Sequence, residues 1–429
     1  MIRKFTIAVV LLLIYFTITT LYPNPEKSGN DITLLLGIMI MAAYLIALIL
    51  RNVKLPKLSG YMILGLILGP IGFNFLSENF INQINFITHL ALSFIALTAG
   101  GEFKFKRIKQ IKNSMLAILV GQVVFVFIGL FLLLYFVSSI IPFLADLNNE
   151  IMIGFSILFA VTALSTSPAV TMGIITEFKA KGRLTDLVLS VTVLKTILLV
   201  LMFPIITAWA KVYLLEGHSF SWDTIQSIAL QLFNSLLTGT ALGFLVIVYL
   251  RYIKVEKSIF LLGVAIIIIE MSYMINAEIL LTSIITGIIV ENFSKEGDAL
   301  IEGIEQSSLP LYVIFFSVAG ASLHLETLKN AILLTVVLVL GRMLFKYIGS
   351  YVGALLTAEK FEIKHYTWLG FIGQAGIAVG LATIIYDAIP NETGLQFKTI
   401  LIGSVVINEM LGPIFFRYGL IKSKEIDAN

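Results

Sequence analysis

Cysteine is absent from the sequence, and charged side chains are scarce. Without cysteine, the protein can form neither disulfides nor thiolate metal sites. Charged residues make up 13% of the 429 residues, whereas soluble domains average about 25%. This shortage excludes a single large soluble core, which needs far more polar surface to stay dissolved. The net charge of +3 gives no indication of a nucleic-acid partner.

Long apolar runs take the place of the missing charges. Apolar residues make up 58% of the chain, which also excludes disorder. A helix needs roughly 20 mainly apolar residues to cross a bilayer, and these runs are continuous rather than alternating, as they would be in a membrane β-barrel. We therefore predict an all-α polytopic membrane protein. The candidate spans are 5–22, 32–50, 59–76, 84–100, 114–141, 151–174, 184–210, 226–250, 258–275, 277–293, 308–322, 329–357, 367–388 and 396–418.

The distribution of lysine and arginine predicts the orientation of these spans. With the N-terminus inside, 22 of the 29 basic residues fall in inside segments and 4 in outside segments, and the other 3 lie within spans. This asymmetry favours cytoplasmic N- and C-termini and the inner (plasma) membrane of a bacterial cell. The longest loop, 211–225, has 15 residues, so we expect no soluble domain.

The first run is open to two interpretations. A basic start followed by an apolar run over 5–22 is typical of a signal peptide, but no small-residue cleavage site follows it. We favour a retained extra helix, which with its loop occupies residues 1–31. The main transmembrane domain then covers 32–425.

Several ionisable residues are predicted to lie inside the bilayer, where such residues mark functional sites by default. Lys195 lies near the middle of its span, and Arg342 and Lys346 share one helix face. Glu270 and Glu409 lie in two further spans. The alternative is that these residues form structural ion pairs, or that Arg342 anchors backbone carbonyls.

Two spans also carry sequences that break a helix. In 151–174, Pro168 follows a run of hydroxyl residues that includes Thr166 and Ser167. Proline removes a backbone hydrogen bond, so the helix is expected to unwind before it, and hydroxyls can then bind the freed carbonyls or an ion. In 367–388, glycines surround the amide of Gln374. A simple proline kink and close helix packing through glycine are the alternatives.

The placement of these breaks indicates an inverted repeat. With 226–250 set aside as a linker helix, two six-helix blocks remain, at 32–210 and 258–418, with opposite orientation. In that register the two broken spans correspond, and the span of Lys195 corresponds to that of Glu409. Paired interrupted helices in inverted repeats are typical of secondary transporters that bind their substrate near the midplane.

From about residue 32 onward, the sequence resembles the monovalent cation:proton antiporter superfamily, which comprises bacterial sodium–proton and potassium–proton exchangers. The resemblance implies thirteen helices in two inverted repeats, two crossed unwound helices and a homodimer; the extra first helix would make fourteen. The stretches that carry it are Leu55–Pro56, Gly60–Pro70, Ala99–Glu102, Ser165–Ala169, Ala180–Gly182, Lys346–Gly349 and Gln374–Gly376.

The resemblance also assigns roles to single residues. Thr166, Ser167 and Pro168 match the first unwound segment, and Gln374 lies in the second. Lys346 matches the core lysine of the family, which pairs with an aspartate.

The sequence departs from the family at the aspartate itself. Lys195 and Thr196 stand where relatives carry the carboxylates that bind either cation or proton. Two facing lysines repel each other in hydrocarbon. Either one of them is then neutral and able to carry a proton, or Glu270 or Glu409 neutralises both.

We therefore predict a secondary transporter that exchanges H⁺ for Na⁺ or K⁺ by alternating access, with an ion site at Lys195, Thr196, Thr166, Ser167, Lys346 and Gln374. Pro168, Glu270, Arg342 and Glu409 are expected to support it. The alternatives are an anion transporter that uses Lys195 and Lys346, or a transport-inactive structural or sensory protein on the same fold. With no visible metal-ligand cluster or nucleophile–base pair, we expect no enzyme and no cofactor.

Overall fold

The computed structural model describes residues 30–51, 57–69, 72, 76, 78–145, 147–215, 222–321, 329–374 and 376–426. Within these ranges all regular structure is helical, as predicted, and no strand occurs. The predicted helix at 5–22 lies outside the described residues. The chain divides into two compact units, Met1–Ala91 with Ser307–Leu325, and Leu92–Gln306 with Glu326–Asn429.

The first unit contains α2 (Asn30–Arg51), α3 (Lys57–Leu68), α4 (Glu78–Gln83) and the second half of α14 (Gly297–Ala321). Glycines allow close contact in this unit. A Cβ atom at Gly65 of α3 would collide with the carbonyl of Ser317 in α14. Close approach through small residues is the usual way to pack helices in a bilayer, where no hydrophobic force drives them together.

The second unit holds most of the chain. Its helices are α5 (Asn85–Gly101, from Leu92), α6 (Phe105–Val137), α7 (Pro142–Ala145), α8 (Asn149–Thr162), α9 (Pro168–Glu177), α10 (Arg183–Leu214), α11 (Trp222–Val248), η2 (Tyr249–Ile253), α12 (Lys257–Ile275), α13 (Ile279–Phe293), the first half of α14, α16 (Ile332–Leu356), α17 (Phe361–Tyr366), η3 (Thr367–Phe371), α18 (Gly376–Ala388) and α19 (Glu392–Lys422).

Within the described residues, 6 helices are long and apolar enough to cross a membrane, or 7 if the bent pair Phe361–Phe371 and Gly376–Ala388 is one span. Other predicted spans correspond to shorter apolar helices, at Leu35–Leu48, Phe86–Gly101, Asn149–Thr162 and Ile279–Phe293. The helix boundaries also differ from the apolar runs. The run 308–322 is only the second part of α14, because the polar turns from Gly297 onward continue the same helix.

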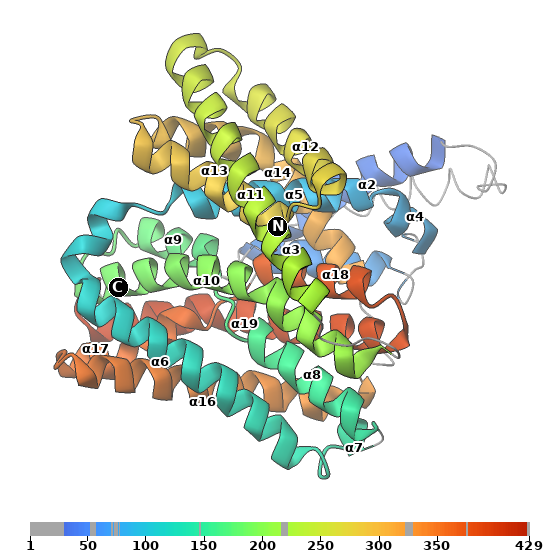
Figure 1. Ribbon diagram of the computed structural model, residues 1–429, viewed down its shortest axis with the longest axis vertical. Coiled ribbons are helices and arrows are strands. Elements are labelled where there is room, and N and C mark those ends of the chain that lie inside the picture. The colour runs from blue at the N-terminus through green and yellow to red at the C-terminus, as the bar shows by residue number, and fades with distance from the viewer. Residues whose placement is uncertain are drawn as a thin grey trace. The chain divides into compact units, whose positions relative to one another are not determined.

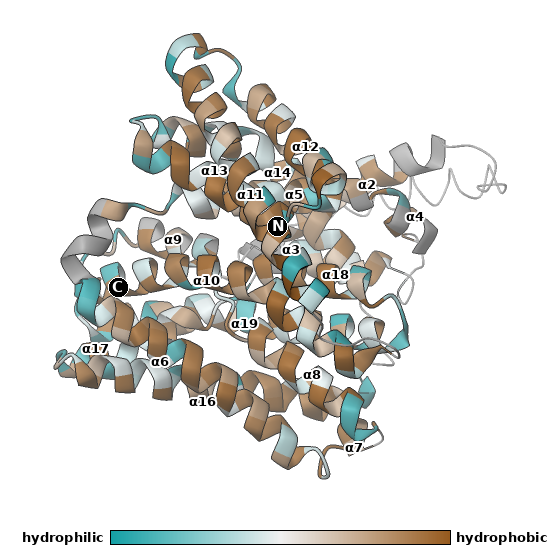
Figure 2. Ribbon diagram, in the orientation of Figure 1, coloured by the Kyte–Doolittle hydropathy of each residue, from teal (hydrophilic) through white to brown (hydrophobic). Residues whose placement is uncertain are grey.

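Helices α6 and α16 form an antiparallel pair along one side of the second unit (Figure 1). Their backbones meet through glycine, since a Cβ atom at Gly121 would collide with the carbonyl of Gly349, and one at Gly353 would lie 2.5 Å from Cα of Ile118. Both helices are largely apolar along their length (Figure 2). Gln122 and Lys346 lie within this contact, where the Gln122 side chain donates to the backbone carbonyl of Lys346.

We expect Gly349→Ala to lower the melting temperature of the detergent-purified protein. Its added methyl group has no room against the Gly121 carbonyl, and such overpacking costs about 1–3 kcal/mol. The matched control is Gly263→Ala in α12, where a Cβ atom meets nothing within 4 Å. Alanine there is expected to leave the melting temperature unchanged or to raise it, because it favours helix formation. Equal melting curves for Gly349→Ala and the wild type would contradict the proposed contact.

Candidate functional site

Two unwound segments meet at the centre of the second unit. One joins α8, which ends at Thr162, to α9, which begins at Pro168; the other joins η3, which ends at Phe371, to α18. The amide of Ser167 donates to the carbonyl of Gly373 at 3.0 Å, and the Thr166 hydroxyl donates to the carbonyl of Phe371 at 3.3 Å. The predicted breaks are therefore confirmed, and they lie against each other. We call these two segments the crossing.

Unwinding leaves backbone carbonyls without helical partners, and two cations from α16 bind them. Arg342 donates to the carbonyls of Ala163, Ile372, Ser165 and Phe371 at 3.0, 2.7, 2.7 and 3.2 Å. Lys346 donates to the carbonyls of Ser165 and Phe371 at 3.1 and 2.7 Å, and to the Thr166 hydroxyl at 3.0 Å. Both side chains are buried. Arg342 thus has the anchoring role that the sequence left open, and Lys346 shares it.

Lys195 on α10 is held much more loosely. Its side chain is 1% exposed. Its ammonium group donates to Oε1 of Gln122 at 3.2 Å and lies 4.4 Å from the centre of the Phe371 ring. It also lies next to the amine of Lys346. An amine that is charged has three donors and no acceptor, so contact between two amines favours a neutral nitrogen on one side.

Gln374 connects the crossing to α19, and Gln122 connects α6 to α16. Gln374 donates to the Ser165 hydroxyl at 2.8 Å, and its own Oε1 accepts from Asn408 on α19 at 2.9 Å. Gln122 on α6 donates to the carbonyl of Lys346 at 2.6 Å and to the hydroxyl of Ser350 at 2.7 Å. The sequence interpretation missed Gln122 and Asn408. The sequence feature that could have identified Gln122 is its position as a lone amide within an apolar run.

Hydroxyl groups complete this region. Thr196 donates to the carbonyl of Thr192 at 3.0 Å, one turn back along α10. The Thr192 hydroxyl is buried and has no hydrogen-bond partner within the described residues. Ser167 caps the start of α9 by accepting from the amide of Val170 at 3.2 Å. These oxygens are potential ligands for a hard monovalent cation, which prefers oxygen donors.

The structure does not bring a carboxylate to the three cations. Glu270 is exposed on α12, and Glu409 is buried on α19 but forms no ion pair among the described residues. In the same part of the chain, no group of three or more His, Asp and Glu residues could hold a metal ion. The site is therefore positively charged and lined by amide, hydroxyl and carbonyl oxygens.

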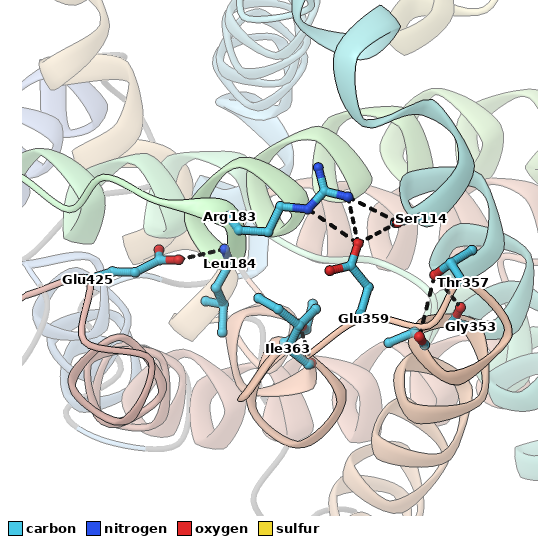
Figure 3. A network of polar contacts seen from close by, with 10 residues as sticks. Ser114, Arg183, Leu184, Gly353, Thr357, Glu359, Ile363 and Glu425 are labelled. Carbon is cyan, nitrogen blue, oxygen red and sulfur yellow. Dashed lines mark hydrogen bonds and ion pairs between the residues drawn. The ribbon is translucent and has the colours of Figure 1, made fainter. Parts of the chain in front are cut away.

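A polar network fixes the end of α10, the helix that carries Lys195 (Figure 3). The Glu425 carboxylate accepts from the amides of Leu184 and Thr185 at 2.6 and 2.8 Å and from the Thr185 hydroxyl at 2.6 Å. A Cβ atom at Gly182 would occupy the space of this carboxylate. A negative charge at a helix N-terminus is favourable, because it interacts with the helix dipole.

The adjacent Arg183 side chain binds a second carboxylate. It donates to Glu359, between α16 and α17, and to Ser114 on α6, and the Ser114 hydroxyl also donates to Glu359. Burial alone would raise the pKa of Glu359, but the bonds from Arg183 and Ser114 outweigh burial and hold the pKa below its usual value. α10 is thus tied to α6 and to the end of α16.

Comparisons with known proteins agree with the fold described above. The family model described as "Sodium/hydrogen exchanger, transmembrane" matches residues 37–417. The fold is similar to two structures of the sodium proton antiporter MjNhaP1 from Methanocaldococcus jannaschii, each 15% identical in sequence. The structure at pH 8 has a TM-score of 0.71 and covers 92% of this chain and 98% of its own. The electron-microscopy structure has a TM-score of 0.70 and covers 91% and 96%. Among curated protein sequences, none matches.

We expect Arg342→Met to destabilise the protein far more than Lys195→Met. Without the guanidinium, the carbonyls of Ala163 and Ile372 lose this donor, at about 1–3 kcal/mol for each unpaired group. Lys195→Met leaves one acceptor, Oε1 of Gln122, without this donor, so its cost is about half that of the two carbonyls, and removal of a buried charge offsets part of that cost. Melting temperatures of the two variants in the same detergent test this, and similar shifts would contradict the separate roles.

The depressed pKa of Glu359 predicts an acid-dependent loss of stability. Its interactions stabilise the fold above pH 4.5, the usual value for glutamate, and this contribution is lost as the pH falls through the lower pKa of the folded state. The wild type should therefore melt above Glu359→Gln at neutral pH, and the difference should disappear in acid. Glu362→Gln, on the neighbouring α17, is the control. A difference that is constant with pH would contradict the assignment.

Proposed function

Because the chain belongs to the sodium/hydrogen exchanger family of transmembrane proteins, we propose that it exchanges H⁺ for Na⁺ or K⁺ by alternating access at the crossing. Family membership makes it a transporter of the cation:proton antiporter superfamily and not an enzyme. The site that we propose consists of Lys195, Thr196, Thr166, Ser167, Lys346 and Gln374. We add Gln122 to this proposal, because it accepts a hydrogen bond from Lys195.

The observation that carries this proposal is the difference between the three buried cations. Arg342 and Lys346 donate to several carbonyls of the crossing, so they are fixed in place. Among the described residues, Lys195 donates to Gln122 and also lies beside the Lys346 amine. Because it donates to none of the carbonyls of the crossing, Lys195 can lose its proton with every bond to the crossing intact.

The proposed exchange is a competition at the Lys195 nitrogen. When the Lys195 amine is protonated, the ammonium group itself occupies the site. When the proton leaves, we propose that the nitrogen lone pair, Oε1 of Gln122 and the hydroxyls of Thr192 and Thr196 on the same helix bind a monovalent cation instead. Because the proton and the metal cation cannot both be accommodated beside Lys346 and Arg342, occupancy by one excludes the other. That exclusion couples the two fluxes.

The proposal extends to the assembly and its orientation. We expect two inverted repeats, at 32–210 and 258–418, and a homodimer in the inner (plasma) membrane with both termini cytoplasmic. The antiparallel pairing of α6 with α16 supports the repeats, because the register described above makes these two helices equivalent.

One observation favours a second candidate function. Lys195, Lys346 and Arg342 form no ion pair with a carboxylate among the described residues, so the site has an uncompensated positive charge. Such a site attracts anions. Transport of an anion is therefore the alternative, and a transport-inactive protein is the third outcome of the experiment below.

Proteoliposomes with an imposed pH gradient test these functions. We expect proton flux that depends on Na⁺ or K⁺, that is lost in Lys195→Met, and that persists in Lys211→Met, a lysine near the far end of the same helix.

Lys195→Asp restores the carboxylate of the family and is expected to create or strengthen flux that depends on Na⁺ or Li⁺. An unchanged Lys195→Asp would contradict the alignment. Flux that requires an anion would favour the alternative, and no flux would refute transport.

A further inference from the structure

Glu409 on α19 differs from three partly buried carboxylates of the described chain. Its side chain is 0% exposed, and neither Oε1 nor Oε2 has a hydrogen-bond partner there. By contrast, Glu278 accepts from the amide of Leu281, Glu359 binds Arg183, and Glu425 caps α10. These three partly buried acids are thus hydrogen-bonded, whereas neither carboxylate oxygen of Glu409 is.

The position of Glu409 places it at the level of the second unwound segment. The preceding residue, Asn408, donates to Gln374, and Gln374 donates to the hydroxyl of Ser165 in the first unwound segment. One turn later, a Cβ atom at Gly412 would lie 2.6 Å from Cα of Gly373. α19 therefore packs directly on the crossing around Glu409, and a shift of the crossing must change its surroundings.

Among the described residues, no charged group forms a hydrogen bond or ion pair with Glu409. The elements packed against α19 include α16 and α10, whose cations Arg342, Lys346 and Lys195 donate to carbonyls, to Thr166 and to Gln122. None of these bonds reaches Glu409. The other titratable groups on the packed elements include Asp186, Glu362, Lys364, His365, Tyr386 and Asp387, and none is hydrogen-bonded to Glu409.

An isolated carboxylate in hydrocarbon is so unfavourable that it takes up a proton instead, and ionisable groups inside a membrane mark transport pathways. We propose that Glu409 is a second proton-binding group of the transport cycle, separate from Lys195. This inference rests on the function proposed above. In the conformation described here the acid is neutral. When a cation enters the crossing, its charge offsets that of the carboxylate, the O–H bond breaks and the proton passes to water.

The test is infrared difference spectroscopy on the full-length protein, combined with flux measurements. At neutral pH we expect the wild type to show the C=O stretch of a protonated carboxyl group that disappears when Na⁺ or K⁺ is added. The band should be missing in Glu409→Gln, shifted in Glu409→Asp and unchanged in Glu392→Gln, which alters an exposed acid of the same helix. In proteoliposomes, fewer protons should move per cation in Glu409→Gln than in the wild type.

A band that is identical in Glu409→Gln, or that does not respond to cations, overturns the inference, as does an unchanged ratio of protons to cations. If Glu409→Gln fails to fold, Glu409→Asp carries the test, because an unshifted band then refutes the assignment. The infrared signal needs no transport. Wild-type proteoliposomes without cation-dependent flux would refute the proposed function, whereas a missing Glu409 band would refute only this inference.

Discussion

Backbone carbonyls that lose their helical partners inside a membrane must find donors within the protein, because hydrocarbon offers none. The crossing creates several such groups at the ends of α8 and η3. Arg342 and Lys346 satisfy them from one face of α16, four residues apart. The rest of the site depends on this solution. It holds the two unwound segments against each other and places positive charge at the negative ends of two helices.

The same arrangement bears on Lys195, which we propose stands at the position of the family's carboxylate. With Arg342 and Lys346 engaged by carbonyls, the structural need for cations is already met. Lys195 then adds a charge that the fold does not require, held by Gln122 and the Phe371 ring. A buried amine with few hydrogen bonds, such as Lys195, is suited to release and take up a proton. A cation whose donors are engaged by carbonyls, such as Arg342, is suited to hold the structure together.

The sequence predicted where the site's helices break and which residues share a face, but it did not predict which side chains are buried or hydrogen-bonded to one another. Pro168 and the glycines around Gln374 identified both breaks, since proline and glycine act on the local backbone. The spacing of Arg342 and Lys346 placed both on one face. The sequence could not show that Glu270 is exposed and Glu409 is buried. Both helices are apolar on all sides, so periodicity does not reveal which face is covered. Gln122 was missed because a single amide in an apolar run has no partner visible in the sequence.

The glycine contact between α6 and α16 has a mechanical consequence. Where two backbones touch directly, no side chains lie between them that could change rotamer and let the helices slide. These two helices must therefore move as one rigid body. Gln122 and Lys346 would then move together with this helix pair. Any rocking that opens the transporter to one side and then the other must therefore be absorbed elsewhere, along interfaces with bulkier and more deformable side chains.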